Sequence, residues 1–120
     1  LDDSRANKKE SRNRTAVNRA YYAVLHAVRA LLILEGVDPE THSGAVTTFS
    51  LRFIKTGLLP VDTVKTIKTL LSRRTDVDYG DFDSIDDEEA EDSVLKADAL
   101  LSIIDALRKT LIDDMKGSTG

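Results

Sequence analysis

Four side chains that can bind or move charge share one stripe of a predicted helix: Arg19, Tyr22, His26 and Arg29, at spacings of 3, 4 and 3 residues. These spacings repeat the period of an α-helix. Seven residues turn a helix by about 700°, roughly 20° short of two full turns, so Arg19 and His26 point in the same direction. The helix rises by about 10.5 Å between them, a gap that the two side chains can close around one small anion.

The chemistry open to this pair is narrow. An Arg guanidinium is always charged and offers a planar fork to phosphate oxygens. A His imidazole can accept or donate a proton near neutral pH. Together they suit attack of a ribose 2′-hydroxyl on the adjacent phosphodiester, a cleavage that needs no metal, and Tyr22 could orient the imidazole or stack on a base. The same spacing also fits an Arg and a His at the edge of an apolar helix face, which is a structural role.

The helix that carries these residues is predicted from about Arg14 to a stop at Glu35-Gly36. Its apolar face repeats at helical spacing through Val17, Tyr21, Val24, Val28 and Leu31. A second helix is predicted from Thr41 or Ser43 to about Lys55, and a third from about Pro60 to Arg74. Their inward positions are expected to be Val46, Phe49 and Phe53, then Val64, Ile67, Leu70 and Leu71.

The last helix has the clearest pattern. Ser84 and Asp87 form a capping-box pattern, and the acidic residues from Asp86 to Glu89 suit the positive end of a helix dipole. A loop is expected over 75–83 before it, and Gly117 is expected to end it. The apolar positions repeat every 3 or 4 residues: Ala90, Val94, Ala97, Leu101, Ile104, Leu107, Leu111 and Met115.

Four amphipathic helices with no strand pattern predict an all-α protein, an up-and-down four-helix bundle over residues 13–116. The first and last helices are the longest and are expected to pack side by side. Residues 1–12 are polar and lack periodicity, which predicts a frayed start or a surface loop, and 117–120 are expected to be a flexible tail.

Composition excludes several classes of protein. The 120 residues suit a single domain, and the absence of Cys excludes disulfides, thiolate nucleophiles and Cys-based metal sites. It also indicates a reducing compartment, so we expect a cytoplasmic protein. No apolar run approaches a membrane span, and no signal peptide is visible. Residues 1–74 carry a charge of +6 and residues 75–120 a charge of −10, so the first part can attract phosphate and the second repels it, although both also fit solvated helix faces.

The segment Ala16–Leu32, AVNRAYYAVLHAVRALL, closely resembles the core helix of HEPN domains, in particular their small stand-alone prokaryotic branch. Further stretches resemble the same branch: Thr41-His42-Ser43-Gly44, Phe53-Ile54-Lys55-Thr56-Gly57, Arg73-Arg74-Thr75-Asp76-Val77-Asp78-Tyr79 and the helix from Ala90 to Ala97. Together they cover about residues 13–112, nearly the whole chain.

The resemblance implies an up-and-down helical bundle that is usually dimeric. Many active relatives are metal-independent endoribonucleases, often toxins of toxin–antitoxin pairs, and their signature is Arg, four to six residues, then His. Arg19 and His26 enclose six residues. By this resemblance Arg19 would hold the phosphate and His26 would handle the proton, with one such pair from each protomer across a dimer cleft. Other relatives are noncatalytic, bind nucleotides or pair with nucleotidyltransferases.

The chain departs from the family pattern at two places. Relatives usually have an amphipathic helix before the core helix, and residues 1–12 do not supply one, so we expect the bundle to lack that N-terminal helix. The residue after Arg19 is Ala20 rather than a second polar group, so the motif is minimal.

Other polar residues offer weaker signals. His42 begins a helix, where it could add a phosphate contact, but we favour the explanation that hydroxyls in this stretch cap backbone amides. Arg73, Arg74 and Tyr79 could line the dimer cleft, or else the arginines could neutralise a helix end while Tyr79 packs on the core. No His or Asp spacing fits zinc or calcium, so we expect neither a metal nor another cofactor.

The sequence therefore predicts a HEPN-type protein with two open functions, and a purely structural helical bundle remains a third reading. The first is a metal-independent endoribonuclease, a toxin that cuts RNA with Arg19 and His26 and meets a cognate antitoxin. The second is a noncatalytic nucleotide-binding or regulatory module that partners a nucleotidyltransferase. In both, RNA or nucleotide contacts are expected from Tyr22, Arg29, His42, Arg73, Arg74 and Tyr79, and a homodimer is expected because one Arg–His pair is half a site.

Overall fold

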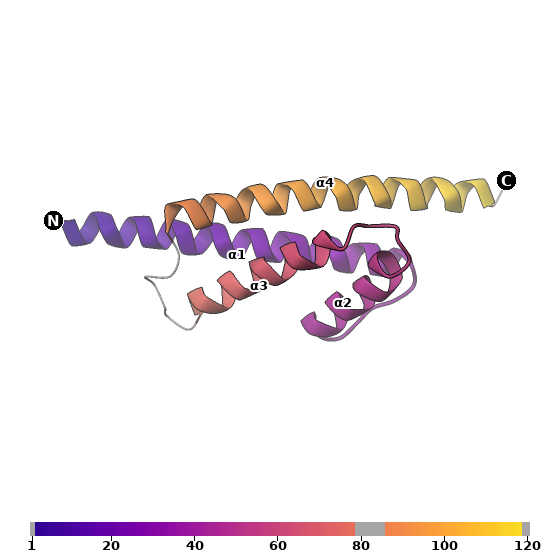
Figure 1. Ribbon diagram of the computed structural model, residues 1–120, viewed down its shortest axis with the longest axis horizontal. Helices are drawn as coiled ribbons and strands as arrows, with labels where there is room; N and C mark the ends of the chain where they lie inside the picture. Colours follow the sequence, from indigo (N-terminus) through magenta and orange to yellow (C-terminus); the bar gives the residue numbers. More distant parts are fainter. Residues whose placement is uncertain (1, 79–85, 119–120) are drawn as a thin grey trace.

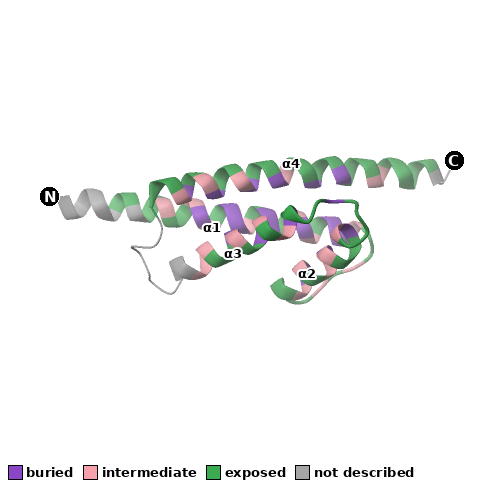
Figure 2. Ribbon diagram, viewed as in Figure 1, coloured by how far each residue is buried: buried purple, intermediate pink, exposed green. Residues whose placement is uncertain are grey.

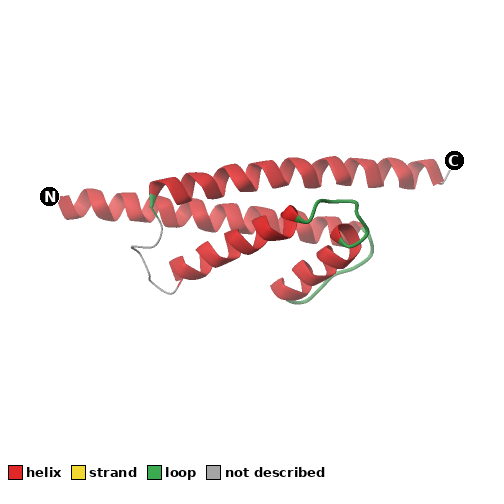
Figure 3. Cartoon of the chain, viewed as in Figure 1, coloured by secondary structure: helices red, strands yellow, loops and turns green. Residues whose placement is uncertain are grey.

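The computed structural model describes residues 2–78 and 86–118, and in this part of the chain every element is helical (Figures 1 and 3). The predicted all-α, four-helix architecture is confirmed. The elements are α1 (Asp2–Leu34), α2 (His42–Phe49), a π-helical turn η1 (Ser50–Ile54), α3 (Asp62–Asp78) and α4 (Asp87–Ser118).

α1 is the helix against which all the others pack. It lies side by side with α4 along most of its length, and both run in the same direction, whereas α3 runs back across them (Figure 1). The chain returns from the end of α1 to the start of α2 by a loop over 35–41. The result is an elongated bundle with extents of 66 × 22 × 21 Å, and its core contains buried residues of all four α-helices (Figure 2).

α1 is longer than the sequence pattern predicts. Residues 2–12, expected to be a frayed start or a surface loop, are helical in the structure. Their Ala, Lys, Arg and Glu residues favour a helix, and Lys9 and Asn13 bind Asp87, at distances of 2.8 and 2.9 Å. Since α4 begins only at Asp87, the described residues offer the first turns of α1 no neighbouring apolar helix face to pack against. The apolar periodicity that marks the rest of α1 is therefore absent there.

The stop predicted at Glu35-Gly36 is confirmed. Gly36 has a φ of +82°, the left-handed conformation in which glycine is favoured. Its N–H donates to the carbonyl of Ile33, and the N–H of Val37 donates to the carbonyl of Leu32. This pair of bonds is the Schellman arrangement, which satisfies the last carbonyls of a helix.

The second predicted helix is present, but its last part is wound more loosely. After α2, residues Ser50–Ile54 form a π-helical turn in which the N–H of Lys55 donates to the carbonyl of Ser50. Phe49 and Phe53 are both buried, with ring centroids 5.5 Å apart. Gly57, with a φ of +82°, then ends the segment.

The end of α3 and both ends of α4 differ from those predicted. α3 continues to Asp78, through the first residues of the predicted loop, and the rest of that loop and Ser84 lie outside the described residues. Asp86 caps α4, because its Oδ1 accepts a hydrogen bond from the Glu89 N–H at 2.8 Å. α4 passes through Gly117 to Ser118, and only residues 119–120 of the predicted tail lie beyond the described part.

Most predicted core positions are buried, and three of the exceptions are exposed for separate reasons. Ile67 and Leu70 are buried, but Leu71 is 38% exposed because it lies beside the contact stripe of α3. Met115 is 51% exposed, since the end of α4 extends past α1 (Figure 1). Val94 is 39% exposed at the edge of the contact between α1 and α4.

Arg73 joins α3 to α4. Its guanidinium donates to Asp92 Oδ2 at 2.8 Å, to Ser93 Oγ at 3.0 Å and to the carbonyl of Glu89 at 3.3 Å. Lys96 also binds Asp92, and the hydrogen bonds from Lys96 and Arg73 hold the pKa of the Asp92 carboxyl below its usual value of 3.8. A charge-assisted network therefore fixes the place of α3 beside α4.

We predict that Asp92→Asn lowers the free energy of unfolding by about 1 kcal/mol at pH 7, a few degrees in Tm. A lowered pKa in the folded state stabilises the protein at pH values above the usual pKa of 3.8, and this stabilisation is lost as pH falls through the lower folded value. The difference between wild type and variant should thus shrink from pH 7 to pH 3 in thermal unfolding. Asp114→Asn is the exposed control on α4. A gap that stays constant over this range would contradict the role given to the carboxylate.

Candidate functional site

The start of α2 is built to present His42. Thr41 is the N-cap of this helix, and its Oγ1 accepts a hydrogen bond from the Gly44 N–H at 2.9 Å. A Cβ on residue 44 would lie 2.8 Å from that same oxygen, so glycine fits the turn and a larger residue would crowd it. The capping explanation of Thr41-His42-Ser43-Gly44 is confirmed, and His42 is left exposed at the first turn.

His42 lies against two tyrosines of α1. Its ring centroid is 6.4 Å from that of Tyr21 and 6.2 Å from that of Tyr22. The two tyrosine rings meet edge to face at 5.2 Å, and the His26 ring is 6.4 Å from Tyr22. The two histidines of the chain therefore flank one aromatic ring, although 16 residues separate them in the sequence.

Arg74 of α3 completes this group. Its guanidinium donates to the Tyr22 hydroxyl at 2.8 Å and lies 5.3 and 5.5 Å from the ring centres of Tyr22 and Tyr21, in cation–π geometry. We call Tyr21, Tyr22, His26, His42 and Arg74 the tyrosine–histidine cluster. It joins residues of three helices, with both imidazoles exposed and Tyr22 and Arg74 half-buried.

Tyr21 forms the buried floor of the cluster. It is 2% exposed, and burial raises the pKa of its phenol, an effect that the positive charge of Arg74 partly offsets. Tyr21 therefore stays uncharged at neutral pH. Its hydroxyl has no hydrogen-bond partner among the described residues, so its contribution comes from the ring.

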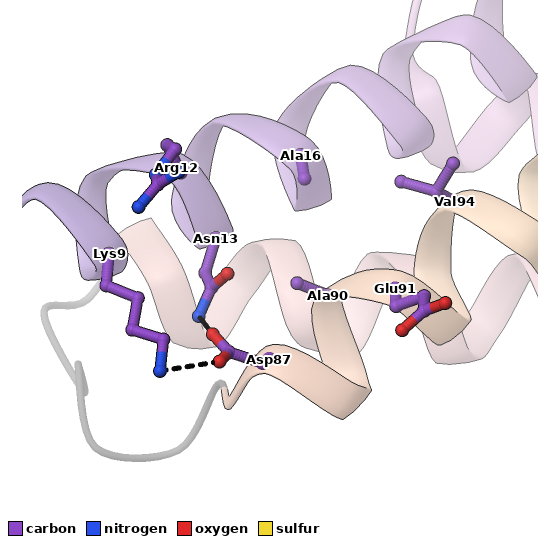
Figure 4. A pocket seen from close by; sticks show the side chains of 8 residues that line it. All are labelled: Lys9, Arg12, Asn13, Ala16, Asp87, Ala90, Glu91 and Val94. Carbon is purple, nitrogen blue, oxygen red and sulfur yellow. Dashed lines mark hydrogen bonds and ion pairs between the residues drawn. The ribbon is translucent and has the colours of Figure 1, made fainter.

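Arg19 lies on the side of α1 that borders α4. It is exposed and lines a groove between the two helices. The groove comprises two hollows of about 370 and 360 Å³ that share Ala16 and Val94. A third hollow of about 270 Å³, lined by α1 residues alone, adjoins it at Ala16. Figure 4 shows the first hollow, where Lys9 and Asn13 reach from α1 to Asp87. We call this feature the α1–α4 groove; it is lined by Arg12, Ala16, Arg19, Ala20, Ala23, Glu91, Val94, Ala97, Asp98 and Leu101, among others.

The groove has an apolar floor and walls of opposite charge. Alanines of α1 together with Val94 and Leu101 of α4 supply the floor. Arg12 and Arg19 lie along the α1 side, while Glu91 and Asp98 lie along the α4 side. Among the described residues none forms a hydrogen bond or ion pair with the Arg19 guanidinium, which leaves it available to an anion.

The remaining predicted residues are not brought to this cluster. Arg29 donates to the carbonyl of Pro39 at 2.8 Å and so holds the loop after α1. Arg73 points to α4, where its guanidinium is held by Asp92 and its neighbours. Tyr79 lies outside the described residues. Arg19, Tyr22, His26, His42 and Arg74 thus remain as candidate site residues.

Comparison with protein families now adds to this geometry. The model of the HEPN domain matches residues 1–107 of the chain, which covers all of α1, α2 and α3 and most of α4. The chain belongs to the HEPN family. The fit extends to the first residue, so the polar start that the sequence pattern set apart is part of the matched region.

Curated relatives of this HEPN chain cover much of its length. A "UPF0332 protein" of Thermotoga maritima is 36% identical over 97% of this chain and 85% of its own. A protein of Methanocaldococcus jannaschii named "Putative toxin MJ0605" is 33% identical over 82% of this chain and 70% of its own. A second protein of that organism, "Putative toxin MJ0142", is 38% identical over 63% of this chain and 52% of its own. Comparison with solved structures finds no match.

None of the helices that the structure describes is long and apolar enough to cross a membrane. This agrees with the charged residues that interrupt the apolar stretches of α1 and α4.

The sequence did not indicate that Tyr21 belongs to the tyrosine–histidine cluster. Tyr21 was assigned to the apolar face of α1, and its contact with Arg74 depends on where α3 docks. The adjacent pair Tyr21-Tyr22 could have indicated this contact. Neighbouring tyrosines on a helix point about 100° apart, so both rings can form cation–π contacts with one cation. Asp92 and Ser93, which hold Arg73, gave no signal beyond their polar character.

We predict that the two tyrosine-to-phenylalanine variants differ in stability. Tyr22→Phe removes a hydrogen bond to a charged group and should lower the free energy of unfolding by about 1–2 kcal/mol. Tyr21→Phe removes a buried hydroxyl that has no described partner and should be neutral or stabilising. Thermal unfolding followed by circular dichroism measures both. A larger loss for Tyr21→Phe than for Tyr22→Phe would overturn this assignment of the hydroxyls.

Proposed function

We propose that this HEPN protein is a metal-independent endoribonuclease of the toxin type, with Arg19 and His26 as its catalytic pair. The observation that carries the proposal is that both side chains are exposed on one continuous helix, seven residues apart. Helical geometry then directs them to the same side, with about 10.5 Å of rise between their Cα atoms.

The pair supplies the two groups that this reaction needs. The Arg19 guanidinium binds the non-bridging phosphate oxygens and offsets the charge that grows on them in the transition state. The His26 imidazole accepts the proton of the 2′-hydroxyl as its oxygen attacks phosphorus. The bond from phosphorus to the 5′-oxygen breaks, and that oxygen takes a proton from an imidazolium of the partner protomer. The products are a 2′,3′-cyclic phosphate and a 5′-hydroxyl.

A second copy of the chain fits the α1–α4 groove. Its apolar floor lacks a covering element within the described part of the chain, and its basic and acidic walls would pair with the opposite walls of an antiparallel copy. Arg19 lines this groove, so dimerisation would bring two Arg–His pairs to one cleft. This supports the homodimer that the proposed reaction requires.

The names of two relatives support the toxin role. Both Methanocaldococcus relatives carry the word toxin in their names. A toxic ribonuclease needs a partner that restrains it, so we propose that an antitoxin or a nucleotidyltransferase binds this chain in the cell.

One observation favours the noncatalytic alternative. The residue after Arg19 is Ala20, which is 6% exposed and packs in the core. It therefore adds no polar group beside Arg19, and the motif depends on two side chains alone. If the chain is a nucleotide-binding module, then ATP or AMP should raise Tm in the absence of any RNA cleavage.

We predict that the wild-type protein cuts RNA in EDTA and that Arg19→Ala and His26→Ala each lower the rate by at least about 100-fold. Gel analysis of a labelled single-stranded RNA measures the rate. The matched control is Arg52→Ala, which removes an exposed arginine of η1 and should cut RNA as wild type does. Equal and negligible cutting by all four proteins would refute the catalytic proposal.

We also predict that Ala23→Glu converts the dimer to a monomer and abolishes cleavage. Ala23 is exposed in the α1–α4 groove, so a glutamate suits the helix but cannot be buried against a second copy. Light scattering at micromolar concentration reports the mass. Ala99→Glu, on an exposed position of α4 outside the groove, should remain dimeric. A monomeric wild-type protein that still cuts RNA would contradict the composite cleft.

A further inference from the structure

We propose that Tyr22, held by Arg74 and His42, is the positioning residue for the His26 imidazole. This inference rests on the proposed function, because the role assigned to His26 is proton transfer. It changes the role expected for Arg74, from a direct RNA contact to control of a neighbouring side chain. Of the two roles that the sequence left open for Tyr22, it selects orientation of the imidazole. Its readout includes a structural measurement that does not depend on ribonuclease activity.

Tyr22 is the helical neighbour of His26. The two residues are four apart on α1, the spacing at which side chains of a helix meet. Their ring centroids are 6.4 Å apart with planes tilted by 47°. His26 is exposed, so a helix alone would leave its imidazole free to change rotamer. Among the described aromatic rings, only that of Tyr22 contacts this imidazole.

The Tyr22 ring is fixed by three other side chains. Tyr21 meets it edge to face at 5.2 Å, and His42 meets it edge to face at 6.2 Å. Arg74 holds its hydroxyl at 2.8 Å and lies 5.3 Å from its ring centre. These contacts come from α1, α2 and α3 respectively, so the orientation of one ring depends on the docking of two further helices.

The fixed orientation of the Tyr22 ring affects proton transfer because it limits where the His26 imidazole can lie. A proton moves efficiently only when the imidazole nitrogen lies within hydrogen-bond distance of the hydroxyl, and a misplacement of about 1 Å can lower a rate by about 100-fold. The Arg74 guanidinium acts through the Tyr22 hydroxyl, to which it already donates, whereas the guanidinium of Arg19 has no such bond within the described residues. The two arginines therefore have different roles: Arg19 binds the substrate and Arg74 orders the site.

The test uses the fact that the chain contains only two histidines. The full chain, with labelled imidazoles, gives two sets of ring signals in nuclear magnetic resonance, and His26→Ala identifies those of His26 by their loss. Tyr22→Phe should shift the His26 signals and weaken the nuclear Overhauser effect between the residue-22 ring and His26. Tyr21→Phe, with its neighbouring ring intact, should leave both unchanged.

Cleavage provides the second readout. Tyr22→Phe and Arg74→Met should each lower kcat by about tenfold or more with little change in KM, because binding to Arg19 is retained. The double variant should be no slower than either single one, since both remove one hydrogen bond. Arg74→Lys, which keeps a donor to the hydroxyl, should recover part of kcat.

The outcomes separate this proposal from the proposed function. If Tyr22→Phe and Arg74→Met both leave the His26 signals of a folded protein unchanged, the positioning role is refuted. A rise in KM with kcat unchanged would also refute it and would favour direct RNA contacts by Arg74. If the signals shift as expected but wild type does not cut RNA, the positioning stands and only the ribonuclease proposal fails.

Discussion

The arrangement of the helices and of the candidate site depends on which sides of α1 are buried by the other helices. One side of this helix is buried under α4, another is covered by α2 and α3, and only the remaining strip is left to solvent. Val17, Leu31 and Leu32 have no exposed surface, which fixes the rotation of the helix in the bundle. Because burial fixes that rotation, it also decides that Arg19 and His26 lie on the exposed strip.

The neighbours of that strip follow from the same packing. On one side lies the α1–α4 groove, with an apolar floor and walls of opposite charge. On the other side lies the tyrosine–histidine cluster, in which α2 supplies His42 and α3 supplies Arg74. The bond from Arg73 to Asp92 ties α3 to α4, so the helix that carries Arg74 is held at both faces. Residues 73 and 74, adjacent in sequence, thus have different partners: Arg73 binds Asp92 of α4, and Arg74 binds Tyr22 of α1.

Periodicity in the sequence was sufficient to predict the helices, because each buries a stripe of aliphatic residues in one core. The Arg19–His26 spacing was equally readable, since it depends on a single helix. The tyrosine–histidine cluster could not be predicted from the sequence, because Arg74 is 52 residues from Tyr22 and contacts it only through the docking of α3. The first turns of α1 were also missed, since residues 2–12 carry no apolar stripe and show their helical state only through propensity and the contacts with Asp87.

The central claim is that a 2′-hydroxyl, with no metal, is the attacking group and that the Arg19–His26 pair drives its attack. The most direct measurement uses an RNA with one 2′-deoxy nucleotide at the preferred cleavage position, incubated with the protein in EDTA and followed by mass spectrometry of the fragments. This account predicts 2′,3′-cyclic phosphate ends on the unmodified RNA and no cut at the deoxy linkage. Cleavage at the deoxy linkage, or fragments with 3′-hydroxyl and 5′-phosphate ends, would contradict it.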